Sequence, residues 1–288
     1  MTFAQTWDRW GTTCSVVTTQ PEELLAARRG CDRVMDEVED ALSTWRDDTE
    51  IVRLRAGWNH VSPVLAGAIT AALWAARTTG GAVDPTIGEA VLRWRDGSAG
   101  PGRDATTAHW TDLEVLDHRV WLPDGVRLDL GALGKAYAAD LAAHLVRRRI
   151  GGGVLVNLGG DIATAGAGPV HGWQVRVQDA PSDPELVVTL EPGMAIATSS
   201  TLHRRTRPDA PDTGHVLDPR SGRSVSGPWR TATAVARTCV AANTWSTAAL
   251  VLGDAVDDWL TSHPAPLRLV DHTGQTHQRC TFPRERAA

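Results

Sequence analysis

Two segments in the first third of the chain carry apolar residues at roughly helical spacing. In residues 21–46 these are Leu24, Leu25, Ala27, Val34, Val38 and Leu42, which predicts an amphipathic helix with Pro21 in its first turn. Residues 62–80 show similar spacing after Ser62-Pro63, a pair that suits a helix cap and a first helical position. Gly80-Gly81 ends this second predicted helix.

Shorter segments rich in β-branched and apolar residues predict strands at residues 11–19, Val154–Leu158, Thr231–Ala236 and Leu267–Asp271. Trp173–Gln178 and Leu186–Leu190 have the pattern of two paired strands. In residues 111–130, short strands flank Pro123-Asp124-Gly125, which predicts a hairpin. Further helices are predicted at about Ala132–Arg149 and at Asn243–Leu252, and loops at residues 96–109 and 202–229.

These elements do not alternate as βαβ units. The chain is therefore predicted to be α+β, with mixed, largely antiparallel sheets and packed helices. Its 288 residues can bury a substantial core, and they suit either one domain over residues 1–288 or two subdomains within it.

Composition argues against several classes of protein. Apolar residues make up 42% and charged residues 22% of the chain, so it has the composition of a globular protein rather than a disordered one. The formal net charge of −5 disfavours non-specific nucleic-acid binding, which needs a basic surface, and no nucleic-acid partner is expected. The four cysteines are scattered without metal-ligand spacing, which favours free buried thiols.

Targeting signals are not evident in the sequence. The first residues lack the basic start, apolar run and small-residue cleavage site of a secretory leader. No stretch approaches the ~18 consecutive apolar residues of a membrane-spanning helix. The expectation is a cytoplasmic protein without a membrane span.

The stretch "LDLGALGKAYAAD", Leu128–Asp140, places charged residues where a strand is expected to meet a helix. Leu128 and Leu130 are predicted to be buried at the strand end, with Asp129 pointing the other way. Lys135 would lie in the first helical turn, where free backbone N–H groups attract anions. Taken alone, the stretch fits a ligand-binding loop and a surface corner with a solvated lysine equally well.

Two further stretches suit phosphate binding. "VLVNLGGDI" ends a hydrophobic strand in Gly159, Gly160 and Asp161, and glycines there would let a ligand reach the backbone. It matches neither the P-loop nor the dinucleotide-binding pattern, so a plain turn is the alternative. "AIATSS" offers the hydroxyl groups of Thr198, Ser199 and Ser200.

Near the carboxyl end, two stretches carry candidates for acid–base and metal chemistry. In "GHVLDPRSG", His215 is a candidate general base because histidine titrates nearest neutral pH, although a lone histidine is more often a surface or packing residue. In "ANTWSTAALVLG", Asn243 and Thr247 are four positions apart and therefore share one helix face. Their oxygens suit Mg²⁺, whereas a polar helix face is the simpler interpretation.

In chain order, these stretches resemble the motifs of the ApbE family, the FAD:protein FMN transferases. The matching pieces are Trp10-Gly11-Thr12, "LSTWRDDTEIVRLR", "TGGAVDPT", "LDLGALGKAYAAD", "LVNLGGDI", "ATSS", "HVLDPRSG" and "ANTWSTAALVLG". Each motif is weak alone. Together they cover about residues 10–253, and their combination in this order is specific.

The resemblance implies an ApbE-like fold and a reaction. FAD would be the substrate, its pyrophosphate would be split with Mg²⁺, FMN would pass to a threonine hydroxyl of an acceptor flavoprotein, and AMP would leave. With two subdomains, the FAD site would lie between them. By resemblance, the metal would take the backbone carbonyl of Ala132 and the side chains of Asn243 and Thr247, and His215 would be the base. The nucleotide would contact Trp10, Trp45, Ala82, Val83, Asp84, Asp129, Lys135, Gly159, Gly160, Asp161, Thr198, Ser199 and Leu217.

Several positions depart from the family pattern. Asn243 replaces the metal-binding aspartate, which keeps an oxygen ligand but removes a negative charge and should weaken Mg²⁺ binding. Trp10, Arg55, Ala136 and Ser200 replace Met, Asn, Gly and Gly. Three functions therefore stay open: an FMN transferase, a metal-dependent FAD pyrophosphatase in which water replaces the threonine, and a non-catalytic flavin-binding protein.

Overall fold

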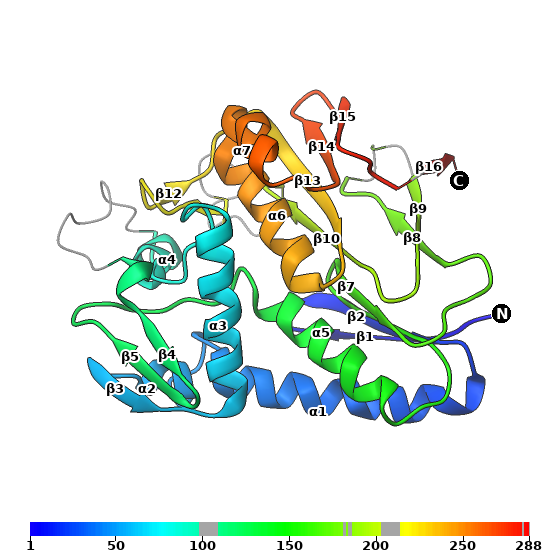
Figure 1. Ribbon diagram of the computed structural model, residues 1–288, viewed down its shortest axis with the longest axis horizontal. Helices are drawn as coiled ribbons and strands as arrows, with labels where there is room; N and C mark the ends of the chain where they lie inside the picture. The colour runs from blue at the N-terminus through cyan, green and yellow to red at the C-terminus, as the bar shows by residue number, and fades with distance from the viewer. Residues whose placement is uncertain (98–108, 181–182, 184–185, 203–213, 284, 288) are drawn as a thin grey trace.

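Figure 1 shows the protein as a computed structural model. It describes the chain except for residues 98–108, 181–182, 184–185, 203–213, 284 and 288. Most of the predicted loop at residues 96–109 and part of the one at residues 202–229 therefore lie outside the described residues.

An eight-stranded sheet forms the centre of the molecule, in the order β1-β2-β6-β7-β10-β13-β14-β15 (Figure 1). Its strands are β1 Phe3–Arg9, β2 Thr12–Thr18, β6 Val154–Leu158, β7 Asp161–Ala165, β10 Ala195–Ser200, β13 Trp229–Ala236, β14 Leu267–Asp271 and β15 Thr276–Arg279. All neighbouring strands in this order pair antiparallel. The predicted α+β fold with largely antiparallel sheets and packed helices is confirmed.

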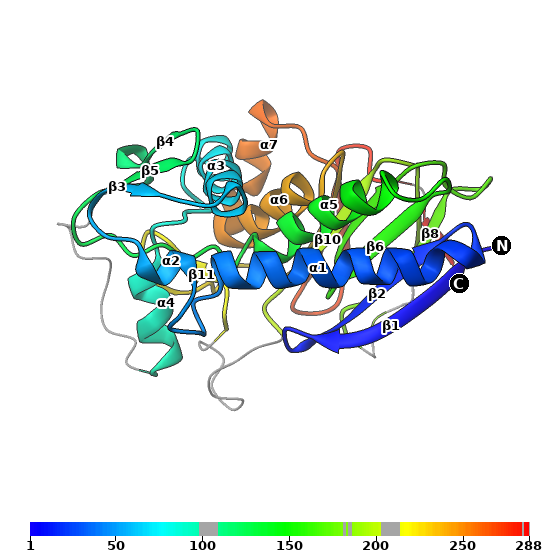
Figure 2. The same cartoon turned by 90° about the horizontal axis from the view of Figure 1, so that it is seen from below.

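Helices cover one face of this sheet. α5, Gly134–Arg147, lies on β6 and β7, and α6, Cys239–Leu252, lies on β10 and β13. α1, Leu24–Leu42, runs alongside α5 and β2, as Figure 2 shows from below. Because side chains alternate along a strand, Val154, Val156 and Leu158 point into this helix-covered core.

A smaller sheet covers the opposite face. It has the order β16-β9-β8, from Glu285–Ala287, Leu186–Leu190 and Trp173–Val177. Leu155, Ile162 and Ile196 of the large sheet pack against apolar side chains of β8 and β9 in a second core cluster. The predicted pairing of β8 with β9 is confirmed, in antiparallel register.

Two further small sheets and several helices complete the described part of the fold. β3 Gly57–His60, β5 Arg119–Leu122 and β4 Glu114–Leu116 form a three-stranded sheet, and β11 Leu217–Asp218 pairs with β12 Arg223–Ser224. The helices are α2 Glu50–Arg53, α3 Pro63–Thr78, α4 Gly88–Arg95 and α7 Val256–Ser262, with 3₁₀ turns at Pro21–Glu23, Trp110–Asp112 and Gly253–Ala255. None of the described helices combines the length and apolar composition needed to cross a membrane.

Capping explains where the predicted helices begin. Ser62 caps α3, since its Oγ accepts a hydrogen bond from the Leu65 N–H at 3.1 Å, and Pro63 follows as the first helical residue. Pro21 opens a 3₁₀ turn that leads into α1. α1 ends at Leu42 rather than at residue 46, because the backbone at Ser43 is extended. α6 begins four residues earlier than predicted, where the Thr238 side chain caps it.

The predicted hairpin in residues 111–130 is present, and so is the turn at Pro123-Asp124-Gly125, but this turn does not join the two strands. β4 and β5 are joined through Asp117 and His118, and the proline turn comes after β5. Residues 128–130 do not form a strand either, although Leu128 and Leu130 are buried as expected. Their backbone follows the 82–85 segment instead, since the Asp129 N–H donates to the Pro85 carbonyl at 2.9 Å.

Asp140 connects the two helices on the sheet. It lies on α5, and its carboxylate accepts hydrogen bonds from the N–H groups of Cys239 and Val240 at 2.8 and 2.9 Å, at the start of α6. Burial raises the pKa of Asp140 to about 6, although these two hydrogen bonds favour the charged form. Desolvation of the carboxylate outweighs them.

This raised pKa makes the stability of the protein depend on pH. In the unfolded chain Asp140 titrates near 4, so the folded protein holds more protons between pH 4 and 6. Relative to Asp140→Asn, the wild type should be most stable near pH 4 and should lose roughly 2 to 3 kcal/mol by pH 7. Urea unfolding of both proteins at pH 4.5, 5.5 and 7 measures this, and a constant difference between them would contradict it.

Candidate functional site

One cleft of about 760 Å³ lies where the large sheet and the small sheet meet α4, the start of α5 and the first half of α6. Its volume lies within the usual range for small-molecule and cofactor sites. Segments from the whole chain line it: the β1–β2 turn, Trp45, residues 82–84, α4, residues 129–135, the β6–β7 turn, β8, β10, residues 215–219 and α6.

The two glycines of "VNLGGD" form the turn of the β6–β7 hairpin. Leu158 and Asp161 pair across it, so Gly159 and Gly160 are its two central residues. Their φ angles of 68° and 91° lie in the left-handed region, as a two-residue hairpin turn requires. The turn is also tight against β2, because a Cβ on Gly159 would lie 2.4 Å from Thr12 Oγ1. The motif is therefore both a hairpin turn and part of the cleft wall.

Asp129 is held in place by three neighbours. Its Oδ1 accepts the Gly131 N–H at 2.8 Å, and its Oδ2 accepts the Thr44 hydroxyl at 3.1 Å. Arg95 Nη2 is 3.7 Å from the same Oδ2. The carboxylate thus stays at the cleft wall in one orientation, with positive charge beside it.

Lys135 is not a solvated surface lysine. Its ammonium group forms an ion pair with Asp161, whose side chain is only 1% exposed. Asp161 Oδ1 also accepts a hydrogen bond from Asn243 Nδ2 at 3.0 Å. One buried carboxylate therefore connects the start of α5, the start of β7 and the first turns of α6.

The contact with Asp161 fixes the orientation of the Asn243 amide. An ionised carboxylate can only accept hydrogen bonds, so the amide must turn its NH₂ group towards Asp161. The carbonyl Oδ1 of Asn243 is then buried without a hydrogen-bond partner among the described residues. A buried acceptor left unsatisfied costs about 1–3 kcal/mol, and a bound cation would remove that cost.

The neighbouring oxygens suit a hard divalent cation. Thr247 lies one helical turn after Asn243, its Oγ1 is 2.9 Å from Ser199 Oγ, and Ala132 lines the same cleft. Within the described part of the chain, no three His, Cys, Asp or Glu side chains cluster in a way that could hold a metal ion. A cation here would bind amide, hydroxyl and carbonyl oxygens, which are ligands that Mg²⁺ accepts.

His215 is half-buried and lines the cleft. The segment that follows it folds back as the β11–β12 hairpin, in which Leu217 pairs with Ser224. The Ser224 hydroxyl donates to the Gly214 carbonyl at 2.5 Å, and the Val225 N–H donates to the Val216 carbonyl at 2.9 Å. These bonds hold the backbone on both sides of His215.

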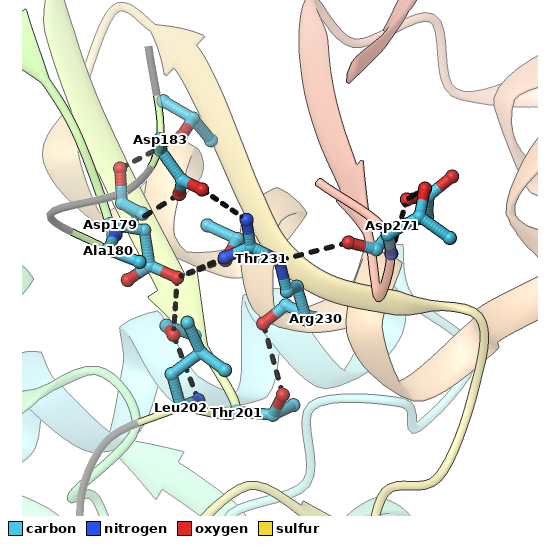
Figure 3. A network of polar contacts seen from close by, with 12 residues as sticks. Asp179, Ala180, Asp183, Thr201, Leu202, Arg230, Thr231 and Asp271 are labelled. Carbon is cyan, nitrogen blue, oxygen red and sulfur yellow. Dashed lines mark hydrogen bonds and ion pairs between the residues drawn. The ribbon is translucent and has the colours of Figure 1, made fainter. Parts of the chain in front are cut away.

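The residues directly after β8 form part of the cleft wall, and a buried polar network, shown in Figure 3, holds them in place. Asp179 lines the cleft and accepts hydrogen bonds from the hydroxyls of Ser200, at 2.9 Å, and Thr231. Arg230 lies between Asp179 and Asp183, at 3.6 and 2.5 Å, and Nε donates to the Asp271 carbonyl at 2.9 Å (Figure 3). The network fixes the end of β8 to β10, β13 and β14.

Most of the residues predicted by resemblance converge on the cleft. Trp45, Ala82, Val83, Asp84, Asp129, Ala132, Lys135, Gly159, Gly160, Thr198, Ser199, His215, Leu217, Asn243 and Thr247 line it. Asp161 lies behind Lys135 and Asn243. Trp10 is not part of the lining either, and its indole Nε1 donates to Glu39 at 2.9 Å. Contact of any of the predicted residues with a nucleotide stays a prediction.

Two parts of the lining were not predicted. One is α4 with Ile87, Val91, Trp94 and Arg95, and the other is the run from Val175 to Asp179. The interleaved Arg-Trp-Arg at residues 93–95 is the only local signal of the first. Nothing in the sequence of β8 distinguishes it from an ordinary strand.

Comparisons with known proteins identify the family of this chain. The model of the ApbE family matches residues 10–269. Proteins named FAD:protein FMN transferase are similar in sequence: that of Salmonella typhimurium is 31% identical, covering 74% of this chain and 67% of the relative. That of Escherichia coli K12 is 30% identical, covering 76% and 69%.

Solved structures show the same fold. The Pseudomonas stutzeri flavinyl transferase ApbE, in its apo form, superposes with a TM-score of 0.81 at 21% identity, over 97% of this chain and 95% of that one. The apbe protein of Thermotoga maritima gives 0.79 at 22% identity, over 97% of both chains.

The unsatisfied Oδ1 of Asn243 predicts how cation binding responds to substitution. Asn243→Asp adds a negative charge at this position and should tighten Mg²⁺ binding about tenfold, or about 1.4 kcal/mol. Asn243→Ala removes the oxygen and should weaken it. Calorimetric titration of Mg²⁺ into the flavin-free proteins measures both. Equal Mg²⁺ affinity of Asn243→Ala and wild type would rule out Asn243 as a ligand.

The Arg230 network predicts a large effect on stability. Arg230→Met removes the cation that lies between the carboxylates of Asp179 and Asp183, and loss of one partner of a buried ion pair typically costs about 3–5 kcal/mol. Arg279→Met, which removes a more exposed ion pair with Asp257, should cost about 1 kcal/mol or less. Urea unfolding of both variants tests this, and similar losses in the two would contradict a structural role for the network.

Proposed function

The chain belongs to the ApbE family, and we propose that it transfers FMN from FAD to a threonine hydroxyl of an acceptor protein, with release of AMP and with Mg²⁺ as cofactor. Relatives about 30% identical to it are named FAD:protein FMN transferase. The observation that carries the proposal is the position of His215, which lines the same cleft as Lys135 and the oxygens of Asn243 and Thr247.

The proposed reaction is a phosphoryl transfer, which depends mainly on positioning and on neutralising charge. The Ala132 carbonyl, Asn243 Oδ1 and Thr247 Oγ1 would hold Mg²⁺, which supplies Lewis acidity towards the pyrophosphate oxygens. Lys135 adds positive charge at the start of α5, although Asp161 balances much of it. The backbone N–H groups of that first helical turn add further attraction for an anion.

His215 would act on the acceptor. One imidazole nitrogen takes the proton of the threonine hydroxyl as that oxygen attacks the phosphorus of the FMN half. A new P–O bond to threonine forms, the pyrophosphate P–O bond breaks, and its electron pair leaves with AMP. The hydrogen bonds on both sides of His215 hold its backbone in place and so limit where the imidazole can reach.

Removal of His215 tests this role. Wild-type protein with FAD, Mg²⁺ and an acceptor domain should give a covalently fluorescent acceptor in a denaturing gel. His215→Ala should label at least 100-fold more slowly, since general base catalysis typically contributes 10²–10⁴-fold, whereas its affinity for FAD should change little.

His171→Ala is the matched control, because this exposed histidine lies outside the cleft lining. Equal labelling by His215→Ala and wild type would contradict the mechanism. Release of FMN and AMP without any labelled acceptor would identify a pyrophosphatase instead. FAD binding without either product would identify a flavin-binding protein.

A further inference from the structure

Arg95 is the last residue of α4, and its guanidinium group lies against the ring of Trp45 in the cleft wall. The guanidinium carbon is 3.8 Å from the centre of the indole ring, which is a close cation–π contact. The same group donates to the backbone carbonyl and to the hydroxyl of Thr44, at 2.8 and 2.7 Å. Arg95 therefore holds the loop after α1 beside α4.

The same contacts extend to Asp129. The Thr44 hydroxyl, which accepts from Arg95, donates in turn to Asp129 Oδ2 at 3.1 Å. Arg95 Nη2 is itself 3.7 Å from that oxygen. Trp45, Arg95 and Asp129 all line the cleft, so the three side chains form one connected part of its wall.

Trp45 is far more exposed to solvent than the other tryptophans of the described residues. It is 75% exposed, and the next most exposed tryptophan of the described residues is Trp58, at 45%. Arg95 covers part of the indole, and the rest of this large apolar surface remains in contact with solvent at the cleft. Aromatic rings in this position commonly stack on planar ligands.

Arg95 also has unused hydrogen-bonding capacity. Its side chain is 14% exposed, and Nε is buried with no hydrogen-bond partner in the described structure. Burial lowers the pKa of Arg95, while Asp129 acts in the opposite direction, and arginine remains charged at any physiological pH. The cleft wall thus holds a permanently charged, planar group. Because Nε is buried, a ligand in the cleft would meet the plane and charge of the guanidinium rather than this donor.

We infer that Arg95 is a nucleotide-binding residue of this cleft: with Trp45 it forms a cationic stacking platform for one of the two planar rings of FAD. The guanidinium group supports the indole from one side and leaves its remaining surface for the ring of the ligand. Its positive charge favours the phosphate that the ribityl chain or the ribose connects to that ring. This inference rests on FAD being the ligand, as in the proposed function.

Direct binding measurements test the platform without turnover. Arg95→Met keeps a side chain of similar length but removes the planar charge, and it should weaken FAD binding at least tenfold in calorimetric titrations. Arg95→Lys restores the charge without the planar group and should recover only part of the affinity. Arg93→Met is the matched control, because Arg93 lies on the same helix but outside the cleft lining, and it should bind FAD like wild type.

A double-mutant cycle separates a platform from a purely structural role. If Arg95 acts through Trp45, Arg95→Met should weaken FAD binding much less in a Trp45→Ala background than in wild type. Additive losses would show that the two residues act separately and would overturn the platform. Titrations with FMN and with AMP identify the ring: a loss for FMN alone indicates the isoalloxazine, and a loss for AMP alone indicates the adenine.

Unchanged affinity of Arg95→Met for FAD, FMN and AMP would also overturn the inference. A different outcome would contradict the proposed function but not the platform. In that case wild type binds FAD more tightly than Arg95→Met and the two residues remain coupled in the double-mutant cycle, yet wild type labels no acceptor.

Discussion

The candidate site depends on one buried carboxylate. Asp161 is almost completely removed from solvent, and an ionised carboxylate in such a place requires partners. It has two of them, the Lys135 ammonium from α5 and the Asn243 amide from α6. Because the carboxylate can only accept hydrogen bonds, it determines which way the Asn243 amide faces. The orientation of the proposed cation ligand is thus set by a residue that does not line the cleft.

Asn243 can donate a hydrogen bond to the Asp161 carboxylate, whereas an ionised aspartate at the same position could not. With aspartate at position 243, two carboxylates would face each other, and one would need a proton or a cation. With Asn243, the Asp161 carboxylate accepts a hydrogen bond from the amide without needing a metal. Among the described residues, Asn243 Oδ1 has no hydrogen-bond partner. The substitution therefore keeps a cation ligand while it makes the metal-free site more stable. We expect weaker cation binding as the consequence, not a loss of the site.

Much of the fold could be predicted because its signals are local. α3 and α5, and the strands β2, β6, β8 and β9, follow from apolar periodicity, caps and β-branched residues within single segments. The failures come from contacts between distant segments. Residues 128–130 follow Pro85 rather than a strand partner, and Arg95 reaches Thr44 across 51 positions. Most of the residues implied by the family resemblance line the cleft. The end of β8 carries no local signal in the sequence, and Arg95 carries only that of the interleaved Arg-Trp-Arg at residues 93–95.

A crystal structure of the protein with FAD and Mg²⁺ would show whether the cleft binds FAD and whether Asn243 binds the metal ion. We expect FAD in this cleft, with its pyrophosphate between Lys135 and His215 and with a metal ion bound by the Ala132 carbonyl, Asn243 Oδ1 and Thr247 Oγ1. Asn243 Nδ2 should still donate to Asp161. FAD bound outside the cleft, or a metal ion that leaves Asn243 Oδ1 without a ligand, would contradict the account.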